Sequence, residues 1–187
     1  MPRRTPEHVP TPEEFEEYPV PITIGVVSDT HLSGRNLDLP IPLVEGLRSV
    51  DLILHGGDIN TLAALRLFEL FAPVRAVVGN NDEPALQRLL PLRRYFRFGR
   101  FTAGLMHGHG VDRLTARQVA EREFRGVVNL GIFGHSHRPL STWIDDFLLF
   151  NPGSATSKRW EPQFSYGLLH IDRESVQAEL CYYPTRH

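Results

Sequence analysis

The sequence predicts a single α/β domain in which two β-sheets face each other and helices cover their outer sides. The chain has 187 residues, which is within the usual size of one domain. From Ile22 onward, short apolar runs alternate with helical stretches, and this alternation is typical of stacked β-α units with a parallel sheet. Late in the chain the apolar runs follow one another directly, which favours an antiparallel second half.

The first half of the domain is predicted to be parallel. Its expected strands are residues 22–28, 51–55 and 74–78. Residues 61–71 lie between the second and third of these strands, and the spacing of Leu62, Leu65 and Phe68 suits one face of a helix. This part of the chain therefore follows a β-α-β order.

The second half is predicted to begin with a hairpin and to continue mainly as strands. Residues 95–98 and 101–106 flank Gly99-Arg100, a dipeptide that suits a tight turn. Residues 114–124 have the pattern of a polar amphipathic helix. The remaining expected strands are residues 127–133, 143–150, 166–171 and 176–183.

The first 21 residues differ in composition from the rest of the chain. They contain six of the 15 prolines and five acidic residues against two arginines, so they are poorly suited to a long helix or a core. We expect residues 1–21 to be a mostly disordered or loosely docked extension, with Phe15 and Tyr18 as the side chains that could dock. Residues 22–187 are expected to form the domain. Deletion of the extension is then expected to change stability and activity very little.

Composition excludes several classes of protein. With 20 basic and 22 acidic residues, the net charge of −2 lacks the positive field that nonspecific binding to nucleic acid or anionic membranes requires. No apolar run reaches the roughly 18 residues of a transmembrane helix, and the start lacks the apolar stretch of a secretory signal. The single cysteine, Cys181, cannot form an internal disulfide. These features predict a cytoplasmic protein without a membrane partner, disfavour nucleic acid as a partner, and leave homo-oligomer formation open.

Polar clusters follow nearly every predicted strand. They are Asp29-Thr30-His31, His55-Gly56-Gly57-Asp58, Gly79-Asn80-Asn81-Asp82, His107-Gly108-His109 and Gly134-His135-Ser136-His137. Ligands bind at the carboxyl ends of strands in open α/β sheets, so these loops can converge on one crevice. Asp, His and Asn side chains are donors that suit manganese, iron, zinc or nickel.

The spacing within two clusters also favours a metal site. Asp29 and His31 are separated by one residue, as are His135 and His137, so each pair could project from an extended segment onto one face and hold one ion. D-x-H alone is a weak signal, G-H-x-H is much stronger, and the ordered set of five clusters is stronger still.

In this order, the motifs D-x-H, G-D, G-N-x-D, H-G-H and G-H-x-H resemble those of the calcineurin-like metallophosphoesterase superfamily. The short chain and Asn151-Pro152-Gly153-Ser154 are similar to the small bacterial and archaeal phosphodiesterases related to the retromer scaffold subunit. The resemblance covers roughly residues 22 to 183. It implies a four-layer αββα sandwich of two mixed β-sheets flanked by helices, with two bound metal ions.

The resemblance also implies a role for each ligand. The ligands of one metal would be Asp29, His31 and His137, those of the other would be Asn80, His107 and His135, and Asp58 would bridge both. Two divalent transition-metal ions are expected, with manganese favoured and iron, zinc or nickel as alternatives. Such ions, roughly 3.5 to 4 Å apart, clamp a phosphate while a metal-bound hydroxide attacks it in line. Asp58 is therefore also expected to be essential for catalysis, and the expected substrate is a small phosphodiester.

Three further residues are candidates for catalysis or substrate binding. Asn81 stands where many members of the superfamily have a histidine that protonates the leaving group, and a neutral amide cannot deliver a proton. His109 could face the substrate or make a hydrogen bond within its loop. Arg138 could clamp the substrate phosphate or form an exposed ion pair. His55 is expected to be a buried, hydrogen-bonded support rather than a ligand.

Two other functions are alternatives to this prediction. A non-catalytic, protein-binding scaffold with a vestigial metal site would be expected to have lost ligands, whereas all seven positions hold competent ligands. A phosphomonoesterase or a nuclease could use the same centre, although the lack of a basic excess weighs against a nuclease. The sequence therefore predicts a metal-dependent phosphoesterase and, within that class, a phosphodiesterase.

Overall fold

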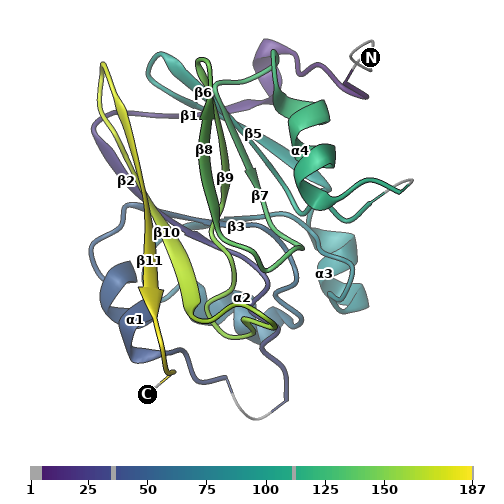
Figure 1. The fold of residues 1–187 in the computed structure, drawn as a ribbon, viewed down its shortest axis with the longest axis vertical. Helices are drawn as coiled ribbons and strands as arrows, with labels where there is room; N and C mark the ends of the chain where they lie inside the picture. The colour runs from purple at the N-terminus through teal and green to yellow at the C-terminus, as the bar shows by residue number, and fades with distance from the viewer. Residues whose placement is uncertain (1–5, 35–36, 111–112, 187) are drawn as a thin grey trace.

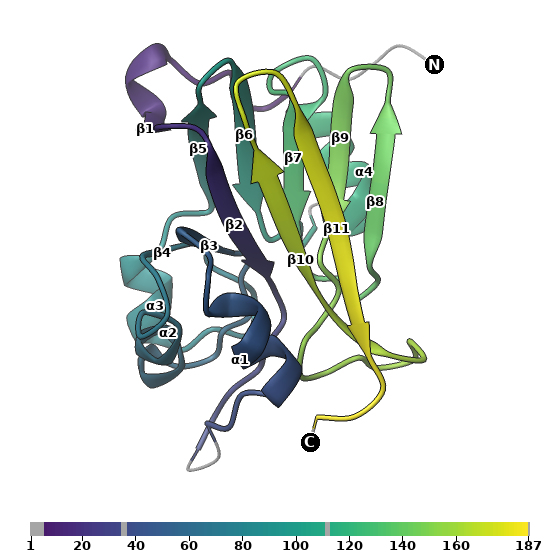
Figure 2. The same ribbon diagram turned by 90° about the vertical axis from the view of Figure 1, so that its left-hand side faces the viewer.

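The computed structural model describes residues 6–34, 37–110 and 113–186. Two mixed β-sheets face each other with helices on their outer sides (Figures 1 and 2), which confirms the predicted α/β architecture. Within these ranges, no helix is both long enough and apolar enough to cross a membrane.

The first sheet has five strands in the order β11-β10-β2-β3-β4. Its strands are β2 (Ile22–Val27), β3 (Leu52–His55), β4 (Val74–Ala76), β10 (Phe164–Ile171) and β11 (Val176–Tyr183). The first three are parallel, as predicted, because α1 (Ile41–Leu47) and α2 (Leu62–Phe68) return the chain to the same end of the sheet. The last two form an antiparallel hairpin beside β2.

The second sheet has six strands in the order β1-β5-β6-β7-β9-β8. Its strands are β1 (Phe15–Tyr18), β5 (Arg93–Phe98), β6 (Phe101–Met106), β7 (Leu130–Phe133), β8 (Leu140–Ile144) and β9 (Phe147–Asn151). The expectation of an antiparallel second half is wrong for this sheet, since β7 pairs in parallel with both β6 and β9. Helix α4 (Ala116–Phe124) is the crossover that gives β7 the direction of β6.

The single strand predicted over residues 143–150 is also wrong, because it is a hairpin of β8 and β9. The turn between them contains Asp145, whose φ of 58° lies in the left-handed region. Aspartate tolerates this conformation better than most residues, so the reversal occurs inside an otherwise apolar run.

Apolar side chains fill three interfaces between four layers. Between the sheets, Ile24 and Leu54 of one sheet share a fully buried cluster with Phe150 of the other. Outside the first sheet, Leu47 of α1 belongs to a second cluster, and outside the second sheet Phe124 of α4 belongs to a third. This packing fixes both sheets and leaves the strand ends free to position loops.

Residues 15–18 of the N-terminal segment are docked along an edge, which agrees with the alternative of docking through Phe15 and Tyr18 and not with a mostly disordered segment. Residues 1–5 lie outside the described part of the chain. Strand β1 pairs in parallel with β5, from Phe15 opposite Tyr95 to Tyr18 opposite Phe98. The rings of Phe15 and Tyr95 lie 5.7 Å apart, and those of Tyr18 and Phe98 lie 5.6 Å apart. Prolines flank this strand without interrupting it, so composition alone did not reveal it.

Charge pairing also holds β1 in place. The carboxylate of Glu16 accepts hydrogen bonds from Arg75 Nε at 2.5 Å and from Arg94 Nη1 at 2.6 Å. Burial raises the pKa of Glu16, but the hydrogen bonds and charges of the two arginines outweigh this effect and lower the pKa overall. Glu16 therefore ties β1 to β4 and β5 together.

Candidate metal centre

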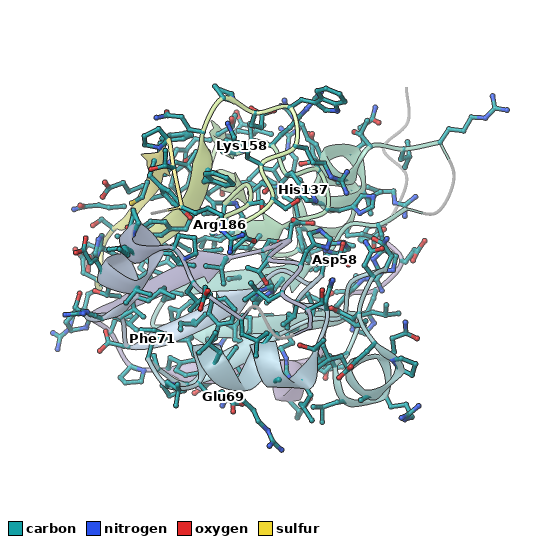
Figure 3. All side chains as sticks on the ribbon, turned by 90° about the horizontal axis from the view of Figure 1, so that it is seen from below. Asp58, Glu69, Phe71, His137, Lys158 and Arg186 are labelled. Atoms are coloured by element: carbon teal, nitrogen blue, oxygen red, sulfur yellow. The ribbon has the colours of Figure 1, made fainter. Side chains whose placement is uncertain are left out.

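The polar loops that follow β2, β3, β4, β6 and β7 meet at one end of the two sheets. The arrows of β2, β6 and β7 point toward this end in Figure 2. Figure 3 looks onto the same end and shows Asp58 and His137 close to each other. All seven residues predicted as metal ligands come from these loops.

Five of the seven predicted ligands have a left-handed backbone. Their φ angles lie between 46° and 66°, in the conformation that side chains rarely adopt, and they are Asp29, His31, Asp58, His135 and His137. The predicted geometry of an extended segment is therefore wrong for the pairs Asp29/His31 and His135/His137. Sharp turns in the loops, rather than strand alternation, bring the two members of each pair together.

The first set of donors contains Asp29, His31 and His137. The Nε2 atoms of the two histidines are 3.2 Å apart, and His137 Nε2 is 3.3 Å from Asp29 Oδ1. Asp29 Oδ2 accepts hydrogen bonds from the Ser28 hydroxyl and from the backbone N–H of His135. By contrast, Asp29 Oδ1 is buried and has no hydrogen-bond partner among the described residues. One carboxylate oxygen thus remains available to the centre.

The second set contains Asp58, Asn80, His107 and His135. His107 Nε2 is 3.2 Å from Asn80 Oδ1, 3.3 Å from His135 Nδ1 and 3.4 Å from Asp58 Oδ2. The same Asp58 oxygen is 3.7 Å from His31 Nε2 of the first set. Asp58 Oδ2 therefore lies between the two sets of donors.

Hydrogen bonds at Nδ1 orient three of the four histidines. The acceptors are the Gly56 carbonyl for His107 at 2.7 Å, Asn60 Oδ1 for His31 at 3.2 Å, and the Ser157 carbonyl for His137. A ring that donates from Nδ1 carries a lone pair on Nε2 when it is neutral. The neutral rings of His31 and His137 would then direct two lone pairs at each other across 3.2 Å, an arrangement that suits a cation.

Burial controls the protonation of the donors. It lowers the pKa of His135 and of His137 to about 4, so both rings are neutral near pH 7. It raises the pKa of Asp29 to about 6. Burial also opposes ionisation of Asp58, but the hydrogen bond and charge of His107, together with Asn81, lower the pKa of Asp58 well below its usual range. A carboxylate and neutral imidazoles that face one another match the donor set of a divalent transition metal.

Comparison with known proteins identifies the family. The calcineurin-like phosphoesterase superfamily domain matches residues 22–174. The chain belongs to this superfamily. A probable metallophosphoesterase of Methanothermobacter thermautotrophicus is 36% identical over 157 residues, which cover 84% of this chain and 90% of that protein. A phosphodiesterase of Methanocaldococcus jannaschii is 28% identical over 151 residues, which cover 70% of this chain and 82% of that protein.

Solved structures confirm the metallophosphoesterase fold. Vps29 from Entamoeba histolytica in complex with Zn²⁺ matches with a TM-score of 0.68 and 24% identity over 86% of this chain and 99% of that chain. A predicted phosphoesterase from Streptococcus pneumoniae matches with a TM-score of 0.65 and 25% identity over 86% of this chain and 89% of that chain.

Buried polar residues support the loops that carry the superfamily motifs. Asn151 Nδ2 donates to the Gly134 carbonyl at 3.0 Å, and the Ser154 hydroxyl donates to the Asp29 carbonyl at 2.8 Å. The turn after β9 therefore does support the floor of the site, as predicted. Asp82 accepts backbone N–H groups of Asn60 and Gly79, at 2.7 Å each, and so joins two of the loops.

His55 also has the predicted supporting role. It is fully buried at the end of β3 and lies outside both groups of candidate metal ligands. Its Nδ1 accepts the backbone N–H of Gly57 at 3.2 Å, so Nε2 carries the proton and donates to Thr30 Oγ1 at 3.0 Å. Burial, together with the charge of His107, lowers the pKa of His55 to about 3 and keeps the ring neutral.

The three further candidates have different surroundings. The amide of Asn81 donates from Nδ2 to Asp58 Oδ2 at 2.7 Å, and its backbone N–H donates to Asp58 Oδ1 at 2.8 Å. His109 lies beside the second set, with its ring 5.2 Å from that of His107, and its buried Nδ1 makes no hydrogen bond within the described ranges. Arg138 is largely exposed, and its Nε lies 3.6 Å from Glu161, as in the predicted alternative of an exposed ion pair.

Sequence reasoning missed two residues near this centre. Asn60 orients His31, as described above. The positive charge of Arg159 contributes to lowering the pKa of His31, His135 and His137, although burial is the larger cause in each case. The run Lys158-Arg159-Trp160, shortly after the Asn-Pro-Gly-Ser turn, was the available signal for Arg159.

Proposed function

We propose that the protein is a phosphodiesterase that uses two divalent metal ions. The observation that carries this proposal is the position of Asp58 Oδ2, which lies between the two groups of metal-binding side chains at 3.4 Å from His107 and 3.7 Å from His31. A carboxylate oxygen in this position suits a ligand shared by two ions. The similarity to the Methanocaldococcus phosphodiesterase supports a diester substrate.

Two bound cations would neutralise charge on the phosphate and lower the pKa of a water molecule between them. The side chains of this protein prepare the centre for those ions. The carbonyl and amide acceptors at Nδ1 direct the Nε2 atoms of His31, His107 and His137 inward. The two hydrogen bonds from Asn81 hold the carboxylate of Asp58 in its charged form.

Proton transfer to the leaving group is the weakest part of this centre. Asn81 is neutral and binds Asp58, so it supplies no proton. Burial and the charge of His107 lower the pKa of His109, which disfavours the imidazolium form of this ring. The proposed substrates are therefore small phosphodiesters whose leaving group is a weak base.

Metal reconstitution combined with a set of esters tests the proposal. Purified protein is stripped with a chelator, dialysed against manganese, iron(II), zinc or nickel, and analysed for metal. We expect about two ions per chain and metal-dependent hydrolysis of bis(p-nitrophenyl) phosphate that the chelator abolishes. Faster cleavage of p-nitrophenyl phosphate or of single-stranded DNA would favour the monoesterase or the nuclease. Less than one ion per chain, with no ester hydrolysed, would refute the proposal and leave the scaffold alternative.

A further inference from the structure

A pocket of 550 Å³ lies beside the candidate metal centre, on the side of α4. Ser136, the residue between His135 and His137, forms part of its lining, so the pocket adjoins the loop that carries these two donors. Its volume is within the range of pockets that hold small organic ligands. Phe133 gives it an aromatic wall.

The pocket concentrates positive charge in a protein whose net charge is negative. Arg117, Arg138, Lys158 and Arg159 all line it, together with a single carboxylate, Glu161. Glu161 lies close to Arg138, and Lys158 Nζ donates to the carbonyl of Pro162 at 2.7 Å. In the described part of the chain, no carboxylate lies within ion-pair distance of the guanidinium groups of Arg117 and Arg159. Two guanidinium groups therefore remain available for an anion.

An aromatic side chain stands at the rim of the same pocket. The indole of Trp160 is 94% exposed, although tryptophan is usually largely buried. A wide planar surface of this kind, next to arginines, suits stacking with an aromatic ligand.

The loop that carries Arg159 and Trp160 is anchored to the metal centre. Its Ser157 carbonyl accepts the hydrogen bond from His137, and Thr156 Oγ1 donates to the Thr30 carbonyl at 2.5 Å. In Figure 3, Lys158 and His137 lie on neighbouring parts of this end of the molecule. One short loop thus orients a metal-binding histidine and presents the pocket's cation and indole.

We propose that this pocket binds the non-reacting part of the substrate, and that this part contains an aromatic ring and a second anionic group, as in a nucleotide with a further phosphate. The inference rests on the proposed function for the position of the reacting phosphate. Arg117 and Arg159 would bind the second anion, and Trp160 would stack on the ring.

Hydrolysis of three esters with one reporter tests this inference. They are methyl p-nitrophenyl phosphate, thymidine 5′-(p-nitrophenyl phosphate), and the latter compound with an added 3′-phosphate. We expect kcat/KM to rise along this series. In Trp160→Ala, the kcat/KM of the thymidine ester divided by that of the methyl ester should fall about tenfold. In Arg117→Gln, the increase in kcat/KM that the 3′-phosphate gives should fall about tenfold. Matched controls are Trp143→Ala on β8 and Arg66→Gln on α2, which lie outside the pocket and should leave both ratios unchanged.

Direct binding separates this inference from the proposed function. Calorimetry with thymidine 3′,5′-bisphosphate, with and without added manganese, should show binding that Trp160→Ala and Arg117→Gln each weaken about tenfold. Binding of this kind without hydrolysis of any ester would sustain the pocket and refute the phosphodiesterase. If the esters are hydrolysed but the kcat/KM ratios and the affinities for the bisphosphate are the same in the pocket variants and the controls, the proposed role of the pocket is wrong and the phosphodiesterase proposal stands.

Discussion

Replacing Ser154 by alanine should destabilise the fold and loosen the metal centre at the same time. The Ser154 hydroxyl is buried, donates to the Asp29 carbonyl at 2.8 Å, and accepts backbone N–H groups of Ser157 at 2.8 Å and of Thr156 at 3.3 Å. Alanine removes all three contacts, and leaving a buried polar group without a partner costs about 1 to 3 kcal/mol. Since the Thr156 contact is long, we count two such groups and expect the free energy of unfolding to fall by about 2 to 6 kcal/mol.

Urea denaturation of the chelated protein measures this loss without a contribution from metal. For a chain of this length, each kcal/mol lowers the melting temperature by about 2 to 4 °C, so thermal denaturation of the same protein should show a decrease of about 4 to 24 °C. The affinity for manganese should also fall about 10- to 100-fold, because Ser157 presents the carbonyl that orients His137. Ser141→Ala, at an exposed position on β8, is the matched control and should change stability by less than about 0.5 kcal/mol. If Ser154→Ala behaves like this control in both measurements, the supporting role of the turn is wrong.

Three other substitutions test separate parts of the molecule. Asp58→Asn should lower the metal content, measured by elemental analysis, well below two ions per chain. Asp146→Asn, in an exposed turn, is the control and should leave the metal content unchanged. Two ions per chain in the Asp58 variant would show that Asp58 is not a ligand shared by both ions. Asn81→His should narrow the difference in hydrolysis rate between aryl and alkyl diesters by a factor of about 10² to 10⁴. If the wild-type rate does not depend on the leaving-group pKa, the idea that this centre lacks a proton donor for the leaving group is wrong. Glu16→Gln should lower the free energy of unfolding at pH 7 by about 1 kcal/mol, and Glu17→Gln should lower it by less. The sequence alone predicts a negligible effect for this segment. Because the folded-state pKa of Glu16 is below 4.5, its contribution is present above pH 4.5 and disappears as the pH falls through the lowered value, so denaturation curves of the wild type and Glu16→Gln should converge in acid.

The sequence predicted the fold class and the loops that meet at the candidate site, but it missed several of the elements around them. Ligand motifs are local, and the loops that carry them follow strands whose apolar runs are unmistakable, as at Val27 and Phe133. Strand β1 was missed because its partner, β5, begins 78 residues later at Arg93, and pairing at this distance leaves no local pattern. Helices α1 and α3 (Pro84–Leu89) were also missed. Helix α1 contains Pro42 and Gly46, which are poor helix formers, and α3 has only six residues.

Local conformation explains the remaining differences. The left-handed backbone at Asp145 reverses the chain where composition indicates one continuous strand. The same conformation at His135 and His137 replaces the extended geometry that their spacing suggested. Aspartate and histidine adopt positive φ only when surrounding contacts hold them there, so these conformations depend on tertiary structure.

The left-handed loops set the direction in which this protein could be made more stable. Glycine at His31, His135 or His137 would relax the backbone, and selection for thermal stability alone would favour it, whereas glycine at Asp29 or Asp58 would leave the hydrogen-bond donors of these carboxylates without a partner. Each such change would also remove one proposed donor. A search for heat-resistant variants that is not coupled to metal binding would therefore favour glycine at the three histidine positions and return stable proteins that lack proposed donors. Adaptation to high temperature in this architecture has to act elsewhere, for example on the ion pairs that hold the N-terminal strand.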